Sequence, residues 1–153
     1  MPPRGDLSRA WALLFARGVL GFIFFMAGVH KVFVMGPLGH ARRFFVGPYA
    51  DTFLPAWSLW ATGAAVPVVE LVAGGLVLLG FWTRPALVSL GFVLVLVTFG
   101  HLLLEPFYEF HSHVIPRLAL LLFVLMLPRE DDRFSADHWI SSRQTSSGRT
   151  GER

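Results

Sequence analysis

The chain has 153 residues, no cysteine and a formal net charge of +3. Hydrophobic residues make up 54% and charged residues 15%, against about 45–50% and about 25% in ordinary soluble domains. This balance excludes a typical soluble domain and predicts an integral membrane protein. Without cysteine, the chain has no disulfide, no thiolate metal ligand and no dithiol relay of its own. Its arginines are dispersed, so no nucleic-acid-binding patch is expected.

Four apolar stretches approach the about 20 residues that a membrane helix needs. The first three are Trp11–Phe33, Trp57–Trp82 and Pro85–Leu104, and the fourth ends at Leu127. The stretch from Pro116 to Leu127 would be only about 18 Å long as a helix, too short for a hydrocarbon core of about 30 Å. The fourth helix is therefore expected to begin near Phe107 to His111.

The connections between these stretches differ in character. Residues 36–56 are rich in Gly and Pro around the segment HARRFFVGPY, which predicts a short interfacial helix or loop with Arg42 and Arg43 at the headgroups. The tail over residues 141–153 contains mostly Ser, Arg, Gly and Thr, so disorder is expected there. The predicted organisation is one transmembrane domain over residues 1–140, followed by this tail.

Orientation is predicted from the distribution of lysine and arginine in short loops. If the N-terminus is inside, the outer side holds Lys31, Arg42 and Arg43. The inner side then holds Arg4, Arg9, Arg84, Arg129, Arg133, Arg143, Arg149 and Arg153. This asymmetry predicts that both termini lie in the cytoplasm.

Charged and small residues share one face on each of the first two helices. The first face carries Arg17, Gly21, Phe24, Gly28 and Lys31, and the second carries Gly63, Pro67, Glu70 and Gly74. Small residues on a stripe let membrane helices approach closely. The pattern therefore predicts that Arg17 faces protein. It also predicts helix contacts at Gly21, Gly28, Gly74 and Gly75.

The depth of Arg17 in the first helix suggests Glu70 as its partner. The two residues lie about 9 Å and about 16 Å from the inner ends of their antiparallel helices, an offset that an arginine side chain spans. Arginine suits forked contact with a carboxylate. The pair would be either a structural ion pair or part of a ligand or proton site, because ionisable groups within a membrane are functional candidates. If Arg17 and Glu70 do not meet, Lys31 or Arg117 is the next candidate partner of Glu70.

A second polar cluster is expected toward the outer side, where three helix ends meet. It contains His30, Lys31, His101, Glu105, Glu109, His111, His113 and Arg117. His101 with Glu105, and His113 with Arg117, are four apart and can share a helix face. The cluster is either solvated loop or a polar pocket open to a quinone headgroup or a small anion. Haem ligation is a further option for histidines in a helical bundle, but no motif supports it, and no metal site is expected.

The chain resembles the DoxX family of small membrane proteins across residues 16–139. The resemblance is carried by R-x3-G-x6-G-x2-K from Arg17 to Lys31, by VELVAGGLVLLGFWTR from Val69, and by RFSADHW from Arg133. The chain departs from that family at residues 128–132, where it has PREDD in place of a glycine-rich turn.

The resemblance implies an all-α bundle of four transmembrane helices in the cytoplasmic (inner) membrane of a prokaryote. Relatives include a subunit of a thiosulfate:quinone oxidoreductase and proteins linked to membrane oxidative-stress complexes. This implies a subunit or accessory of a quinone-linked redox system. Quinone would be its possible cofactor, and lipid and other redox subunits its partners. The alternatives are a small-solute or proton transporter and a non-catalytic scaffold that docks soluble partners. No catalytic residue is identified.

Overall fold

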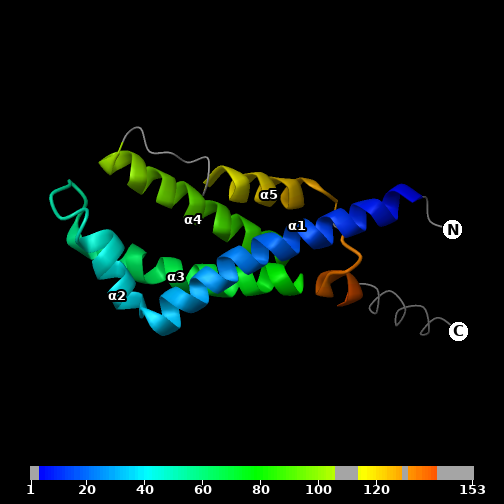
Figure 1. The fold of residues 1–153 in the computed structure, drawn as a ribbon, viewed down its shortest axis with the longest axis horizontal. Helices are drawn as coiled ribbons and strands as arrows, with labels where there is room; N and C mark the ends of the chain where they lie inside the picture. The colour runs from blue at the N-terminus through cyan, green and yellow to red at the C-terminus, as the bar shows by residue number, and fades with distance from the viewer. Residues whose placement is uncertain (1–3, 106–113, 129–130, 141–153) are drawn as a thin grey trace, which may run out of the picture.

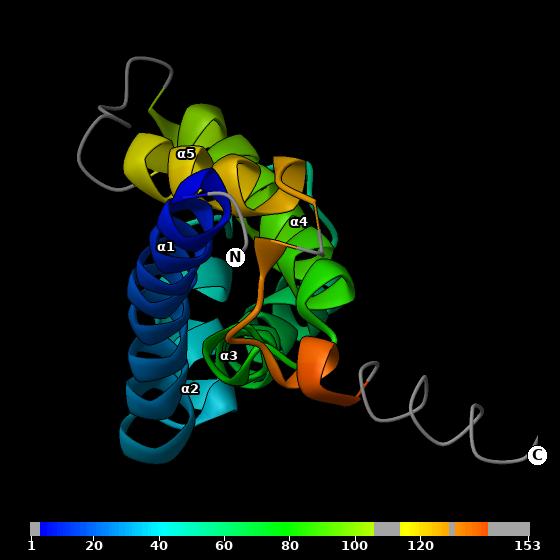
Figure 2. The same cartoon turned by 90° about the vertical axis from the view of Figure 1, so that its right-hand side faces the viewer.

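The computed structural model describes residues 4–105, 114–128 and 131–140, and within these ranges it is helical with no strand. Three long helices are α1 (Arg4–Val29), α3 (Ala56–Leu79) and α4 (Thr83–Leu104), and the shorter α5 covers Val114–Met126 (Figure 1). Viewed from one end, these four helices surround a common core (Figure 2). That core is built from apolar residues of all four helices, among them Leu13, Leu20, Val77, Leu90 and Leu121.

Three segments are long and apolar enough to cross a membrane, judged by length and composition. They are Leu7–Val34, Ala56–Leu79 and Thr83–Leu104. The 13 residues of α5 span about 20 Å, short of the about 30 Å of a hydrocarbon core. The predicted start of the fourth helix lies within residues 106–113, outside the described residues. The described chain therefore has three candidate spans and one shorter apolar helix, and the full four-span bundle stays a prediction.

The two glycine-bearing faces bring α1 and α3 into backbone contact. A Cβ added at Gly21 would lie 2.8 Å from the backbone nitrogen of Leu78, and one at Gly74 would lie 2.5 Å from that of Phe25. A Cβ at Gly28 would meet the backbone of Leu71 equally closely. Close approach of this kind is what small residues permit in membrane helices. The contacts also fix the antiparallel register, with Gly21 level with Leu78 and Gly28 level with Leu71.

The connection between α1 and α3 is helical and packs onto α3. It consists of the π-helical turn η1 (His30–Val34), the short helix α2 (Pro37–Ala41) and the π-helical turn η2 (Arg42–Val46). The sequence predicted a short interfacial helix here, and Arg42 and Arg43 are indeed exposed. Residues His40 and Ala41 are buried, however, so α2 is a packed element of the bundle.

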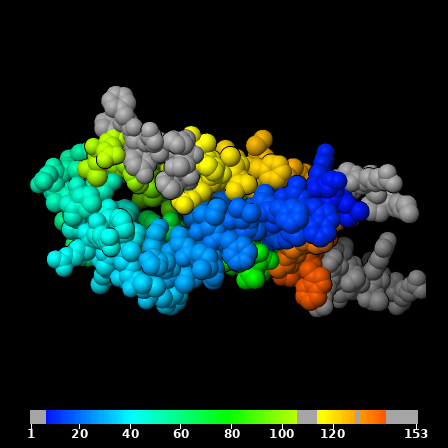
Figure 3. Space-filling view, viewed as in Figure 1, coloured from blue at the N-terminus to red at the C-terminus, as the bar shows by residue number. Residues whose placement is uncertain are grey.

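The end of the described chain folds back onto its beginning. We call residues 131–140 the C-terminal segment; Ser135 opens its short helix, and the Ser135 Oγ accepts a hydrogen bond from the His138 backbone N–H at 3.1 Å. The segment lies against the first turns of α1, where Trp11 and Phe134 have ring centroids 4.9 Å apart (Figure 3). The predicted disordered tail, residues 141–153, lies outside the described residues.

Candidate functional site

A buried ion pair joins η1 to the middle of α3. The Lys31 Nζ donates to the Glu70 Oε2 at 2.5 Å. The Glu70 side chain is 5% exposed and that of Lys31 is 27% exposed. A charge within the membrane costs at least about 2.5–3.5 kcal/mol at a helix centre, so each partner needs the other.

A histidine next to this pair fills a gap in the hydrogen bonding of α3. Pro67 has no N–H to donate, so it leaves the carbonyl of Gly63, four residues earlier, without its helical partner. The His40 Nδ1 lies 2.8 Å from that carbonyl oxygen, and a Cβ at Gly63 would lie only 2.6 Å from the Ala41 Cα. Gly63 and Pro67 together therefore form the site at which α2 packs on α3.

Burial favours the neutral form of His40, and the Gly63 carbonyl favours the tautomer with its proton on Nδ1. Burial is the largest effect on the pKa of His40 and lowers it below the usual 6.5. The charge of Lys31 also lowers this pKa, whereas the bond to Gly63 and the charge of Glu70 partly offset the decrease. Because a carbonyl oxygen only accepts, the proton sits on Nδ1 and Nε2 is an acceptor. Lys31, His40 and Glu70, from three different elements, form what we call the Lys31–His40–Glu70 cluster.

The lowered pKa of His40 predicts a loss of stability in mild acid. As pH falls through about 6.5, a histidine in the unfolded chain takes up a proton, while the folded His40 stays neutral until lower pH. The free energy of unfolding should therefore fall between about pH 7.5 and about pH 5.5. His40→Asn keeps a donor for the Gly63 carbonyl but does not titrate. Thermal unfolding in one detergent should show a smaller pH effect for this variant, and an unchanged effect would contradict the assignment.

Arg17 does not meet Glu70, so the predicted pair was wrong. The Arg17 Nη2 donates to the Phe134 carbonyl oxygen at 3.1 Å, and its Nε lies 3.8 Å from the Asp132 Oδ2. The Arg17 side chain is 2% exposed and packs against Gly80, where a Cβ would overlap the guanidinium. Lys31, the alternative named from the sequence, is the residue that holds Glu70.

The register of α1 and α3 explains why Arg17 and Glu70 stay apart. The sequence placed the start of the first helix at Trp11, level with the end of the second. In the structure α1 begins at Arg4 and extends past the end of α3, so Arg17 lies beside Gly80. The ten residues of helix from Gly80 to Glu70 amount to about 15 Å, more than the predicted offset. The C-terminal segment fills the corner that this overhang creates.

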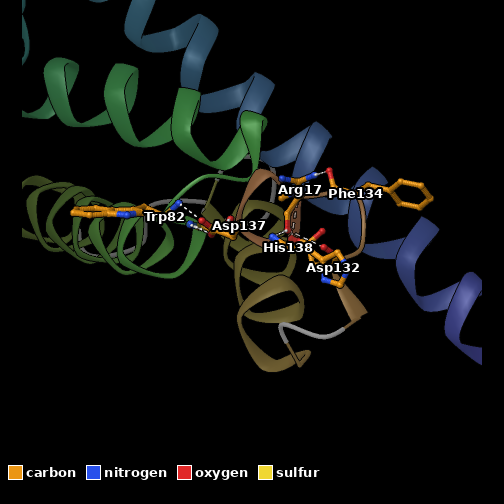
Figure 4. A network of polar contacts seen from close by, with 8 residues as sticks. Arg17, Trp82, Asp132, Phe134, Asp137 and His138 are labelled. Atoms are coloured by element: carbon orange, nitrogen blue, oxygen red, sulfur yellow. Dashed lines mark hydrogen bonds and ion pairs between the residues drawn. The ribbon is translucent and has the colours of Figure 1, made fainter. Parts of the chain in front are cut away.

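The C-terminal segment also caps α4. The Asp137 Oδ1 accepts from the Trp82 backbone N–H at 3.0 Å, and its Oδ2 accepts from the Thr83 backbone N–H at 3.2 Å (Figure 4). The Asp137 N–H donates to the Gly80 carbonyl oxygen at 3.0 Å. Asp137 therefore caps the N-terminus of a helix that begins 54 residues earlier in the chain, in the way that an N-cap side chain would.

Loss of this cap should destabilise the fold measurably. Asp137→Ala removes both acceptors of the α4 N-terminus and should lower the free energy of unfolding by about 0.5–2 kcal/mol, the usual cost of a lost N-cap. Asp137→Asn retains one acceptor and should be milder. Asp51→Ala, in the exposed connection before α3, is the matched control. Equal midpoints of thermal unfolding for Asp137→Ala and Asp51→Ala would contradict the capping role.

One family model matches the chain, over residues 9–108, which is 100 of its 153 residues. That model describes MauE, the methylamine utilisation protein. The chain belongs to the MauE family. The DoxX assignment made from the sequence motifs was wrong, since the matching family is a different one. No curated protein and no solved structure shows a significant match to the chain.

The MauE match covers one of the two polar regions and only part of the other. All of the Lys31–His40–Glu70 cluster lies within it, as do Arg17 and the turn from α3 to α4. The C-terminal segment, which supplies Asp132 and Asp137, lies beyond residue 108. With its apolar helices, this MauE-family chain is a multi-pass membrane protein.

The described residues of the predicted outer cluster lie in different surroundings. His30 and Glu105 are exposed, and the His101 Nδ1 lies 2.8 Å from the Val97 carbonyl oxygen of its own helix. The Arg117 guanidinium lies over the Phe24 ring at 5.8 Å. His113, with Glu109 and His111, lies outside the described residues.

The Cβ of a side chain at the predicted packing residue Gly75 would touch the Phe25 ring at 3.4 Å.

Sequence reasoning missed His40 and Asp137. A glycine four residues before a proline inside an apolar helix signals a free carbonyl, and that signal is present at Gly63 and Pro67. Asp137 follows two residues after Ser135, a typical helix-opening residue. Neither pattern says which distant element the side chain meets.

Proposed function

We propose that this chain is a membrane accessory of a redox system for methylamine utilisation. The family match supports the setting, because the MauE model is described as a methylamine utilisation protein. The chain has no cysteine, so it has no thiol couple of its own. Partner subunits, in the membrane or soluble, would exchange electrons with the ligand that this chain binds. The membrane is the cytoplasmic (inner) membrane of a prokaryote.

The buried His40, held on the Gly63 carbonyl near the Lys31–Glu70 pair, is the observation that carries the proposal of a functional site. An ion pair alone would be enough to hold η1 against α3. The cluster has in addition the imidazole of His40, which is held on the Gly63 carbonyl and lies close enough for the charges of Lys31 and Glu70 to act on its pKa. Such a set can give a proton and take one, as ionisable groups within membranes commonly do.

A quinone headgroup is the ligand that we propose for this cluster. Its carbonyl oxygens accept hydrogen bonds, and the Lys31 side chain is 27% exposed, so its ammonium can donate to a ligand while paired with Glu70. The His40 Nε2 can accept from a quinol hydroxyl. A bound quinone would supply the two-electron chemistry, and the cluster would hold and exchange its protons.

Growth and lipid extraction together test this function. A strain that lacks the gene should grow poorly with methylamine as sole nitrogen source, and the wild-type gene should restore growth. His40→Asn should restore growth less well, while Asp51→Asn should restore it fully. Quinone should be extracted from the purified wild-type protein and not from Lys31→Met. Normal growth of the deletion strain would overturn the role in methylamine utilisation.

Two other outcomes would replace the hypothesis of a quinone-linked function. Uptake of a small solute or of protons into liposomes, without bound quinone, would make the chain a transporter. A stable soluble partner, with neither quinone nor uptake, would make it a non-catalytic scaffold.

We also propose four spans with both termini in the cytoplasm, because the arginines gather on that side. A reporter that is active only in the cytoplasm should work at the C-terminus and fail after Asp51. With three spans in place of four, the N-terminal and C-terminal reporters would lie on opposite sides of the membrane. This result would contradict the four-span topology.

A further inference from the structure

A cavity of about 670 Å³ lies at the end of the bundle, away from the Lys31–His40–Glu70 cluster. It is enclosed by the start of α4, the end of α5 and the C-terminal segment. Its location at the end of two helices places it at the depth where lipid headgroups lie in a spanning bundle.

The wall of this cavity has an apolar part and a charged part. The apolar part includes Leu13, Leu87 and Val124. The charged part has one cation, Arg84, and two carboxylates, Asp132 and Asp137, with His138 beside them. The cavity therefore offers charges of both signs next to a hydrocarbon surface.

Asp132 has an oxygen that lacks a partner. Its Oδ2 faces the Arg17 Nε at 3.8 Å, but its buried Oδ1 accepts no hydrogen bond. The residue is 9% exposed. The neighbouring Arg17 Nε and Nη1 are likewise buried without a hydrogen-bond partner, so this corner holds unmet donors as well as an unmet acceptor. The Asp132 side chain is 13% exposed, so its carboxylate still presents negative charge to the cavity.

The other polar groups of the wall are already partly engaged. The Asp137 oxygens accept from the α4 N-terminus, and the Thr83 Oγ1 donates to the Asp137 Oδ2 at 3.4 Å. Arg84 is exposed and uses one nitrogen on the Leu127 carbonyl oxygen at 3.4 Å, so its guanidinium retains donors for a phosphate. Trp82, which also lines the cavity, has a φ of 48°, an uncommon conformation for a bulky residue.

We propose that this cavity binds a phospholipid whose headgroup carries a primary amine, such as phosphatidylethanolamine. The ammonium donates to the exposed part of the Asp132 carboxylate, the phosphate lies against Arg84, and an acyl chain follows the apolar wall. A zwitterion matches the balanced charges better than an anion does, because two carboxylates line the same wall. This site is separate from the proposed quinone site, and it does not depend on it.

Lipid binding to the purified full chain in detergent, followed by native mass spectrometry, tests the proposal. Phosphatidylethanolamine and phosphatidylcholine differ in the methyl groups on nitrogen, so only the first has N–H donors. The first should bind at least about tenfold more tightly, since a hydrogen bond to a charged group is worth that much. Phosphatidylglycerol, which has no amine, should bind as weakly as phosphatidylcholine.

Variants assign the preference to the two charges. Asp132→Asn should abolish the preference for phosphatidylethanolamine over phosphatidylcholine. Arg84→Gln should weaken binding of both lipids, while Arg42→Gln, on the exposed η2 turn, should change neither. If Asp132→Asn fails to fold, the relative affinities of the wild type for phosphatidylethanolamine and phosphatidylcholine still test the proposal.

Two results would overturn the proposal. Equal binding of the three lipids, or tighter binding of phosphatidylglycerol, would show that no ammonium site exists. Saturation by soluble phosphoethanolamine as readily as by the lipid would show that the ligand is a headgroup compound and not a phospholipid. The quinone content of the same preparation reports separately on the Lys31–His40–Glu70 cluster.

Discussion

Lys31→Met is expected to lower the free energy of unfolding by about 3–5 kcal/mol, the usual cost of breaking a buried ion pair. The Glu70 side chain is 5% exposed, so it cannot turn to water when its partner is removed. It must remain an unpaired charge or take up a proton, and both are costly near neutral pH. The measurement is thermal unfolding in one detergent.

Glu70→Gln should cost less, about 1.5–3 kcal/mol, the range for a hydrogen bond to a charged group. The Lys31 side chain is 27% exposed and can extend toward solvent when its partner is lost. The double variant Lys31→Met with Glu70→Gln should recover stability relative to Lys31→Met alone. The coupling energy of the cycle reports the pair directly. Losses that add strictly would mean that the two side chains do not interact.

Gly28→Ala is expected to destabilise the protein by about 1–3 kcal/mol or more, as overpacking does. Its Cβ would lie 2.5 Å from the Leu71 Cα, and a helix backbone cannot yield as a flexible side chain does. Alanine should therefore be damaging here, although it is the smallest possible addition. Gly28→Leu should be worse still, since the whole side chain would wedge α1 from α3.

Gly18→Ala is the matched control for Gly28→Ala. It lies on the same helix, and a Cβ there meets nothing within 4 Å. Alanine is a better helix former than glycine by about 1 kcal/mol, so Gly18→Ala should be neutral or stabilising. The measurement is again the midpoint of thermal unfolding. If both variants unfold at the same midpoint, the glycine face is not a close contact.

The sequence predicted which faces of the first two helices meet, because periodicity alone determines a face. Gly21, Gly28 and Gly74 lie where α1 and α3 approach closely, whereas Gly63, on the same face of α3, meets Ala41 of α2. Periodicity says nothing about axial register, which is set by where helices begin. The start of α1 at Arg4 placed Arg17 beyond the reach of Glu70.

The partners of Arg17 could not be read from local pattern. Asp132 and Phe134 are more than 110 residues away, in a segment that follows the last apolar helix. The contact of His40 with Gly63 could not be predicted either, because it depends on the path of the connection between α1 and α3. The outer polar cluster stays a prediction, because three of its members, Glu109, His111 and His113, lie outside the described residues.

The family was also misread for a physical reason. The motifs used, an arginine with spaced glycines and a glutamate before paired glycines, describe a close helix crossing with a buried charge. Any small membrane protein with such a crossing needs residues of this kind at this spacing. Motifs of this type therefore report the contact between two helices more strongly than they report descent.

The docking of the C-terminal segment on α1 has a consequence for the order of assembly on the ribosome. Arg17 is made early and would enter the bilayer with its helix, whereas Asp132 and Phe134 are joined to the chain more than 110 residues later. Until then the guanidinium has neither of these partners, so the first helix cannot reach its final packing before residues 131–140 have been made. Completion of this corner of the bundle therefore follows the synthesis of all the apolar helices.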